Sequence, residues 1–91
     1  MIAVTRFTVP AEEAESFTGQ ARSVLTALET MPGHDGGRLA RAMDDQDLWL
    51  MITEWEGAGF YRRALSNFEV RMAILPLMTY MINEPGAYEP V

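Results

Sequence analysis

The segment Leu48–Glu56 constrains the fold more than any other part of the chain, because it is apolar on both faces of a β-strand. Successive side chains of a strand point to opposite sides, so Leu48, Leu50 and Ile52 share one face. The other face carries Trp49, Met51, Thr53 and Trp55. Since both faces are largely apolar, both must be covered. The sequence therefore predicts a sheet with helices on one side and a second apolar surface on the other.

The first half of the chain shows a strand and then a helix. Ile2–Val9 is rich in β-branched and aromatic residues and predicts a strand. Apolar residues then recur at helical spacing, at Ala14, Phe17, Ala21, Val24, Leu25 and Leu28. Pro32 and Gly33 end this predicted amphipathic helix.

The second half of the chain predicts two strands, a helix and then a last strand. Gly37–Met43 predicts a strand, which the polar turn at 44–47 joins to Leu48–Glu56. A helix in two pieces follows Gly57, with a capping-box pattern at Ser66 and Glu69 for the second piece. Leu77–Asn83 predicts a last strand. The order β-α-β-β-α-β predicts one domain over 1–91, of α+β class and ferredoxin-like topology, with an antiparallel sheet and both helices on one face.

The face opposite the helices is expected to carry Trp49, Met51 and Trp55. So much exposed apolar surface usually marks an interface or a binding cavity. Domains of this size often gain stability from disulfides, metals or partner subunits, and this chain has no Cys. We therefore expect a homodimer in which two sheets pack face to face and enclose a pocket in each subunit.

Composition excludes several classes of function. The net charge is −6, with seven Arg and no Lys, which disfavours binding to nucleic acid or to an anionic membrane. His34 is the only His, so a His/Cys metal site is not expected. No Gly-rich phosphate loop follows a strand, so no nucleotide or flavin cofactor is expected either. We read the turn at 44–47 as a solvated hairpin, since it lacks the Gly and Glu of a calcium loop. The absence of an export signal or a long apolar run predicts a cytoplasmic protein.

Several motifs resemble those of the antibiotic biosynthesis monooxygenase superfamily. They are a strand ending in Phe7–Pro10, the turn Met31–Gly36, a strand closing on Glu54–Glu56 and the ending Glu84–Tyr88. The resemblance covers essentially the whole chain. It implies a dimeric α+β barrel and, for one branch, cofactor-free oxidation of anthrone-like aromatic polyketides to quinones.

In that branch a Trp, a Tyr and an Arg line the pocket, and Trp55, Tyr61 and Arg71 match them. The branch also has an Asn that would hold a substrate carbonyl, where this chain has Met51. A second branch degrades haem with a His, a Trp and an Asn. The corresponding positions here are Ile74, Ala64 and Thr5, so haem degradation is not expected.

The candidate catalytic residues each have an alternative interpretation. Arg71 is a candidate stabiliser of an enolate or phenolate, or else a solvated surface Arg. Tyr61 would pass or accept a proton, or else is a Tyr of the core or interface. Trp55 would form a flat pocket wall, or else belongs to the packing of a dimer core. His34 is expected to be an exposed loop residue rather than a base at a pocket mouth.

The residues predicted to bind substrate are Trp49, Met51, Thr53, Phe60 and Met72. Their apolar and adaptable side chains suit a small aromatic or apolar substrate. The leading hypothesis is a cofactor-independent monooxygenase that uses molecular oxygen on an aromatic or polyketide-like substrate. The alternatives are a non-catalytic small-molecule-binding protein on the same dimeric barrel, and a polyketide cyclase or isomerase.

Overall fold

Strand β3 (Leu48–Trp55) is an inner strand of a four-stranded sheet in the computed structural model, which describes all 91 residues. It pairs antiparallel with β1 (Ile2–Thr8) on one side and with β2 (His34–Arg41) on the other. A short strand β4 (Ala87–Tyr88) adds to the free edge of β1, which gives the order β2-β3-β1-β4. The predicted antiparallel sheet is therefore confirmed.

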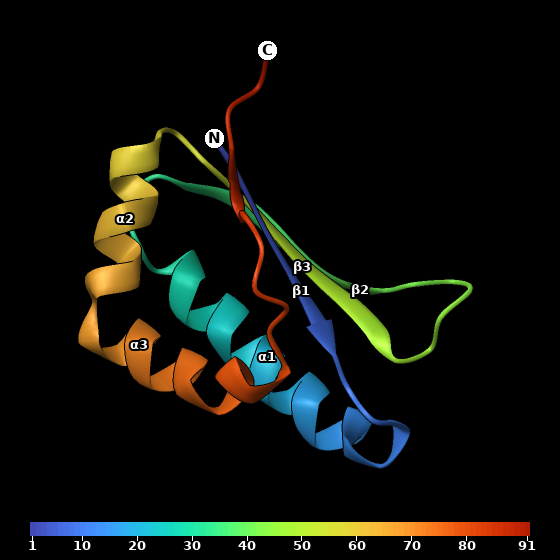
Figure 1. Cartoon of the computed structure of the whole chain (residues 1–91). Helices are drawn as coiled ribbons and strands as arrows, with labels where there is room; N and C mark the ends of the chain where they lie inside the picture. Colours follow the sequence, from blue (N-terminus) through green and yellow to red (C-terminus); the bar gives the residue numbers. More distant parts are fainter.

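The helices lie on one face of this sheet (Figure 1). They are η1 (Ala11–Glu13), α1 (Ala14–Glu29), α2 (Ala58–Ser66), α3 (Phe68–Ile74) and η2 (Leu75–Tyr80), where η marks a 3₁₀ helix. The arrangement is the ferredoxin-like α+β fold that the order of elements predicted. The helical layer and the sheet enclose the space in which a site can form.

Helix α1 packs on the sheet through the predicted apolar stripe. Its residues Phe17, Ala21, Val24 and Leu28 are buried. The Phe17 ring lies 5.0 Å from Phe7 of β1, 5.4 Å from Trp49 of β3 and 5.5 Å from Tyr80 of η2. Because aromatic rings bury large areas and prefer edge or tilted contacts, this cluster fixes the angle at which α1 crosses the sheet.

The turn from α1 into β2 depends on Gly33. Its φ is +84°, and a Cβ at this position would lie 2.3 Å from the Phe60 ring. Only glycine combines this backbone conformation with such close contact at no steric cost. The turn thus holds the start of α2 against the start of β2.

Asn67 separates α2 from α3. It has an extended backbone, and its side-chain oxygen accepts a hydrogen bond of 3.1 Å from the backbone N–H of Val70. The predicted capping box began one residue earlier, at Ser66, but the Ser66 hydroxyl donates to the carbonyl of Arg63 instead. An Asn at the N-cap serves the same purpose, since it satisfies an otherwise unpaired helix N–H.

Two predicted strands differ from the observed ones. The second strand begins at His34 rather than Gly37, because the turn is completed at Gly33. The last strand is not at Leu77–Asn83: Pro76 sits in the first turn of η2, where its missing N–H costs nothing, and Leu77 points into the core. Only Met81 retains a single bridge to Phe7.

The prediction of which face of β3 is open was wrong. Met51, Thr53 and Trp55 are buried under the helices, and Trp49 packs beneath α1. The uncovered face carries the half-buried side chains of Ile2, Val4, Leu48, Leu50 and Ile52. The alternation of side chains along β3 assigned each residue to the correct face. It could not show which face the helices cover, because both faces are apolar.

Candidate functional site

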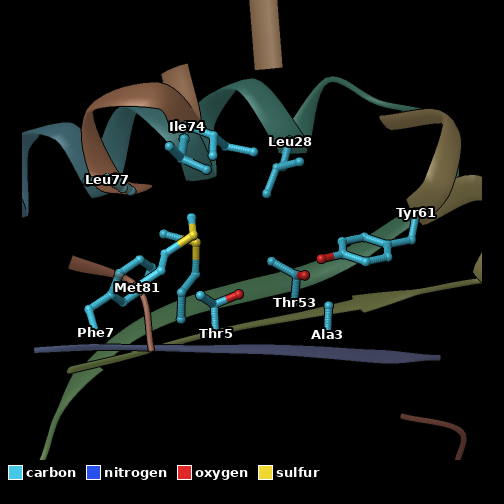
Figure 2. Close-up of a pocket in the computed structure, with 11 residues that line it drawn as sticks. Ala3, Thr5, Phe7, Leu28, Thr53, Tyr61, Ile74, Leu77 and Met81 are labelled. Atoms are coloured by element: carbon cyan, nitrogen blue, oxygen red, sulfur yellow. The ribbon is translucent and has the colours of Figure 1, made fainter. Parts of the chain in front are cut away.

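A small cavity of about 40 Å³ lies between the sheet and the helices. Figure 2 shows its floor on β1 and β3 and its roof of helical side chains. Its eleven lining residues are Ala3, Thr5, Phe7, Val24, Leu28, Met51, Thr53, Tyr61, Ile74, Leu77 and Met81. The cavity therefore lies within one subunit, not between two packed sheets as the sequence suggested.

The cavity is apolar except for three hydroxyl groups. Thr5 and Thr53 supply two of them from the floor, and Tyr61 of α2 supplies the third. Figure 2 shows the Tyr61 hydroxyl pointing into the cavity above Thr53. The Tyr61 hydroxyl has no hydrogen-bond partner within the protein, so it is free to bind a ligand oxygen.

The local environment of Tyr61 determines its protonation state. Burial raises the pKa of the Tyr61 phenol above its ordinary value of 10.0, because an apolar environment disfavours the charged form. Tyr61 is therefore a neutral phenol near pH 7. In this form it can donate a hydrogen bond to an oxygen that carries negative charge, but it is a poor proton acceptor.

Trp55 supports Tyr61 from outside the cavity. Its ring lies 5.6 Å from the Tyr61 ring, and its Nε1–H donates a hydrogen bond of 2.9 Å to the Thr53 hydroxyl oxygen. Trp55 is only 2% exposed. It thus positions two of the three cavity hydroxyl groups without lining the cavity itself.

His34 is not the exposed loop residue that the sequence favoured. It is the first residue of β2, and its ring contacts the edge of Trp55 with centroids 5.2 Å apart. The Nε2 atom of His34 is buried and has no hydrogen-bond partner. His34 does not line the cavity, and Trp55 lies between it and Tyr61.

Two predicted substrate-binding residues pack elsewhere. Trp49 contacts Phe17, and the Arg41 guanidinium lies 4.7 Å from the centre of its ring. Phe60 lies against Gly33, with the Arg63 guanidinium 4.8 Å from its ring centre. Of the five residues predicted to bind substrate, Met51 and Thr53 line the cavity.

Arg71 and Met72 lie in a different depression, on the outer surface of the helical layer. We call it the α3 groove; it is lined by Leu65, Phe68, Arg71, Met72, Ile74, Leu75 and Met78. Arg71 is exposed and makes no ion pair or side-chain hydrogen bond. The structure thus brings Trp55 and Tyr61 together but places Arg71 outside the cavity.

Most cavity residues were not among those predicted from the sequence to bind substrate; Thr5 and Ile74 were named only as positions where the residues of a haem-degrading site are absent. Thr5 is a polar residue between Ala3 and Phe7 on the buried face of β1, a pattern visible in the sequence. Leu28, Leu77 and the other apolar lining residues give no such signal, because they resemble ordinary core residues.

Neither a cluster of metal ligands nor a membrane-spanning helix is found in the chain. No group of three or more His, Cys, Asp or Glu side chains is arranged to hold a metal ion. None of the helices has the length and apolar character needed to cross a membrane.

Comparison with known families identifies the kind of protein to which this fold and cavity belong. The family model described as antibiotic biosynthesis monooxygenase matches residues 1–73. Since the match spans most of the chain, the chain belongs to the antibiotic biosynthesis monooxygenase family. No curated protein matches it.

Solved structures agree with this assignment. SnoaB, a cofactor-independent oxygenase from Streptomyces nogalater, is 25% identical with a TM-score of 0.78, over 89% of this chain and 82% of that chain. A conserved protein from Methanosarcina mazei Go1 is 13% identical with a TM-score of 0.80, over 94% of this chain and 84% of that chain. A structure described as an antibiotic biosynthesis monooxygenase is 12% identical with a TM-score of 0.80, over 100% of this chain and 99% of that chain. The last two similarities show the fold alone.

Proposed function

We propose that the chain is a cofactor-independent monooxygenase that oxidises a small aromatic or polyketide-like substrate with molecular oxygen. The observation that carries this proposal is the Tyr61 hydroxyl, which points without a protein partner into an apolar cavity. Membership of the monooxygenase family and the similarity to SnoaB support it.

The cavity residues limit the class of substrate. They include no carboxylate, His or Lys, so the cavity offers no side chain that would act as a base near neutral pH. The substrate must then have a C–H group that its own ring system makes acidic. An anthrone-like ketone, whose reacting CH₂ lies between aromatic rings, meets this requirement.

Oxygen reacts with such a substrate only after the substrate has lost a proton. The CH₂ group gives its proton to water, and the resulting enolate transfers one electron to O₂. The two radicals combine to form a C–O bond, and the resulting peroxide anion takes a proton back from water. Loss of one water from this hydroperoxide leaves a second carbonyl. Overall the CH₂ is oxidised to C=O, one oxygen atom enters the product and the other leaves as water.

The protein promotes the step in which negative charge develops. A neutral Tyr61 phenol donates a hydrogen bond to the enolate oxygen, and the apolar walls strengthen that bond by keeping bulk water away from this oxygen. The Thr53 hydroxyl oxygen accepts from Trp55, which leaves its own proton free to donate to the substrate. Because Arg71 lies in the α3 groove, we assign the charge stabilisation to Tyr61 rather than to Arg71.

We also propose that the protein works as a homodimer. The uncovered sheet face carries five half-buried apolar side chains side by side, and clustered apolar side chains favour association. A second copy packed against it would cover the apolar face and stiffen the floor of the cavity.

Oxygen consumption by metal-stripped protein with a model anthrone tests the proposed reaction. Uptake above the spontaneous rate, with quinone as the product by mass spectrometry, is the expected result. Tyr61→Phe should reduce it, and Tyr88→Phe, which alters an exposed tail residue, should not. Binding without oxygen uptake would instead indicate a non-catalytic binding protein, and a product of unchanged mass would indicate a cyclase or isomerase.

A further inference from the structure

The α3 groove holds most of the exposed large apolar side chains of this chain. Phe68 is 75% exposed, Met78 57%, Leu75 53% and Met72 47%. Only three other large apolar residues are comparably exposed, and none of these lines the groove. Clustered exposed apolar residues usually mark a binding surface, whereas scattered ones need no explanation.

Ile74 connects this groove with the buried cavity. It is the last residue of α3, and it is the only residue that lines both. Figure 2 shows its side chain in the cavity roof beside Leu28. Ile74 is therefore the point at which the cavity and the groove come closest in the lining of the two spaces.

The sizes of the two spaces show why such a connection matters. The cavity is about 40 Å³, enough for a few water molecules but far below the usual size of a ligand site. The groove is an open depression of about 530 Å³, which has room for a ring system that the cavity lacks. A substrate with two or three fused rings thus needs the groove as well as the cavity.

Arg71 gives the groove a definite chemical preference. It is the only charged residue in the lining, and no carboxylate neutralises it. A guanidinium in such a place favours a carboxylate or phenolate on the ligand.

From these observations we propose that the α3 groove is the outer half of the substrate site. It would hold the distal, anionic end of an elongated aromatic substrate against Arg71. Ile74 then controls access of the reacting carbonyl oxygen to the cavity beneath, which is too small for a whole ring. This inference rests on the proposed function for the identity of the inner site, and it assigns to Arg71 a role in binding and to Ile74 a role in specificity.

Two stable ligands that cannot undergo the reaction test the proposal separately from catalysis. Anthraquinone-2-carboxylate is flat and anionic, and 2-(hydroxymethyl)anthraquinone is its uncharged analogue. Affinity for the full chain is measured by calorimetry, and association rates by stopped-flow quenching of Trp fluorescence. Arg71→Ala is compared with Arg62→Ala, which removes an exposed Arg of α2 that lines neither space.

Arg71→Ala should weaken binding of the carboxylate by about threefold to tenfold, as expected for a partly exposed ion pair, and leave the uncharged ligand unchanged. Arg62→Ala should affect neither. Ile74→Ala should speed association of both ligands, and Ile74→Trp should slow it by about tenfold or more, because the passage is widened or blocked. Circular dichroism checks that each variant is folded, and Ile74→Val provides a milder second variant.

Other results would overturn the proposal. One is an equal loss of affinity for both ligands in Arg71→Ala. Another is an unchanged association rate in both Ile74→Ala and Ile74→Trp. A third is that neither ligand binds to the native chain. A change in oligomeric state in Phe68→Asp would also overturn it, since the groove would then be a contact between protein chains. Binding as expected with no oxygen uptake from an anthrone would uphold the two-part site while rejecting the oxygenase reaction.

Discussion

The rings of Tyr61 and Trp55 lie 5.6 Å apart at an angle of 51°, and this contact places the Tyr61 hydroxyl in the cavity. Trp55 is in turn fixed by its hydrogen bond to Thr53 and by the edge of His34. An anchored aromatic pair of this kind holds a donor in one orientation before a ligand arrives. Such preorganisation is the main way in which a protein stabilises developing charge.

Tyr61→Phe should lower the rate of oxygen uptake from an anthrone by about tenfold to a hundredfold. The change removes one preorganised donor to the enolate, a loss that typically falls at or above this range. Since the hydroxyl has no partner in the protein, the free energy of unfolding should change by only about 0.5 kcal/mol or less. An oxygen electrode and urea denaturation measure the two effects. A rate equal to that of the native chain would remove Tyr61 from the mechanism.

The protonation of Tyr61 can be followed directly. Burial raises its pKa, so the folded chain holds this proton more tightly than the unfolded chain does. The resulting stability is fully present below pH 10, near the ordinary Tyr pKa, and is lost as pH rises through the raised value. The pKa of Tyr80 is raised as well, by the hydrogen bond that its hydroxyl donates to Glu13. Absorbance at high pH should therefore show two phenols that ionise above the ordinary pKa, and one of these two transitions should be missing in Tyr61→Phe. A titration identical in both proteins would contradict the burial of this hydroxyl.

The sequence predicted the order of elements well because each long element carries its own periodicity. Alternation in Leu48–Trp55 and the stripe from Phe17 to Leu28 needed no tertiary information. The covered face of β3 could not be predicted in this way, since both faces are apolar. It is decided by contacts between distant residues, such as the Phe17 ring against Trp49.

Removing the hydrogen bond between Trp55 and Thr53 should destabilise the fold. Thr53→Val leaves the buried indole N–H without a partner, which costs about 1–3 kcal/mol in the free energy of unfolding. In a Trp55→Phe background the same substitution should cost less, because no N–H remains to be satisfied. Denaturant unfolding of all four proteins gives the coupling energy. Equal costs in both backgrounds would show that the hydrogen bond contributes nothing to stability.

The candidate site was predictable only in part, and Arg71 shows why. Tyr61 follows Trp55 by only six residues. The end of β3 and the first turn of α2 therefore bring these two residues together. Arg71 lies beyond the break at Asn67, and the direction of α3 after that break decides where its side chain points. Cavity residues such as Leu77 come from η2, which the sequence suggested was a strand.

Leu50→Arg should convert the proposed homodimer into a monomer. Leu50 lies in the middle of the uncovered sheet face, opposite Arg6 of the neighbouring strand. The Glu84 carboxylate already binds Arg6 through both of its oxygens, so a second guanidinium buried there would lack a counter-charge of its own. An unpaired buried charge costs about 3–5 kcal/mol. Light scattering should give twice 10.2 kDa for the native chain and 10.2 kDa for the variant. Ala11→Arg adds the same charge at an exposed position outside this face and should remain dimeric. A native chain of 10.2 kDa at micromolar concentration would rule out the dimer, and a dimeric Leu50→Arg would place the interface elsewhere.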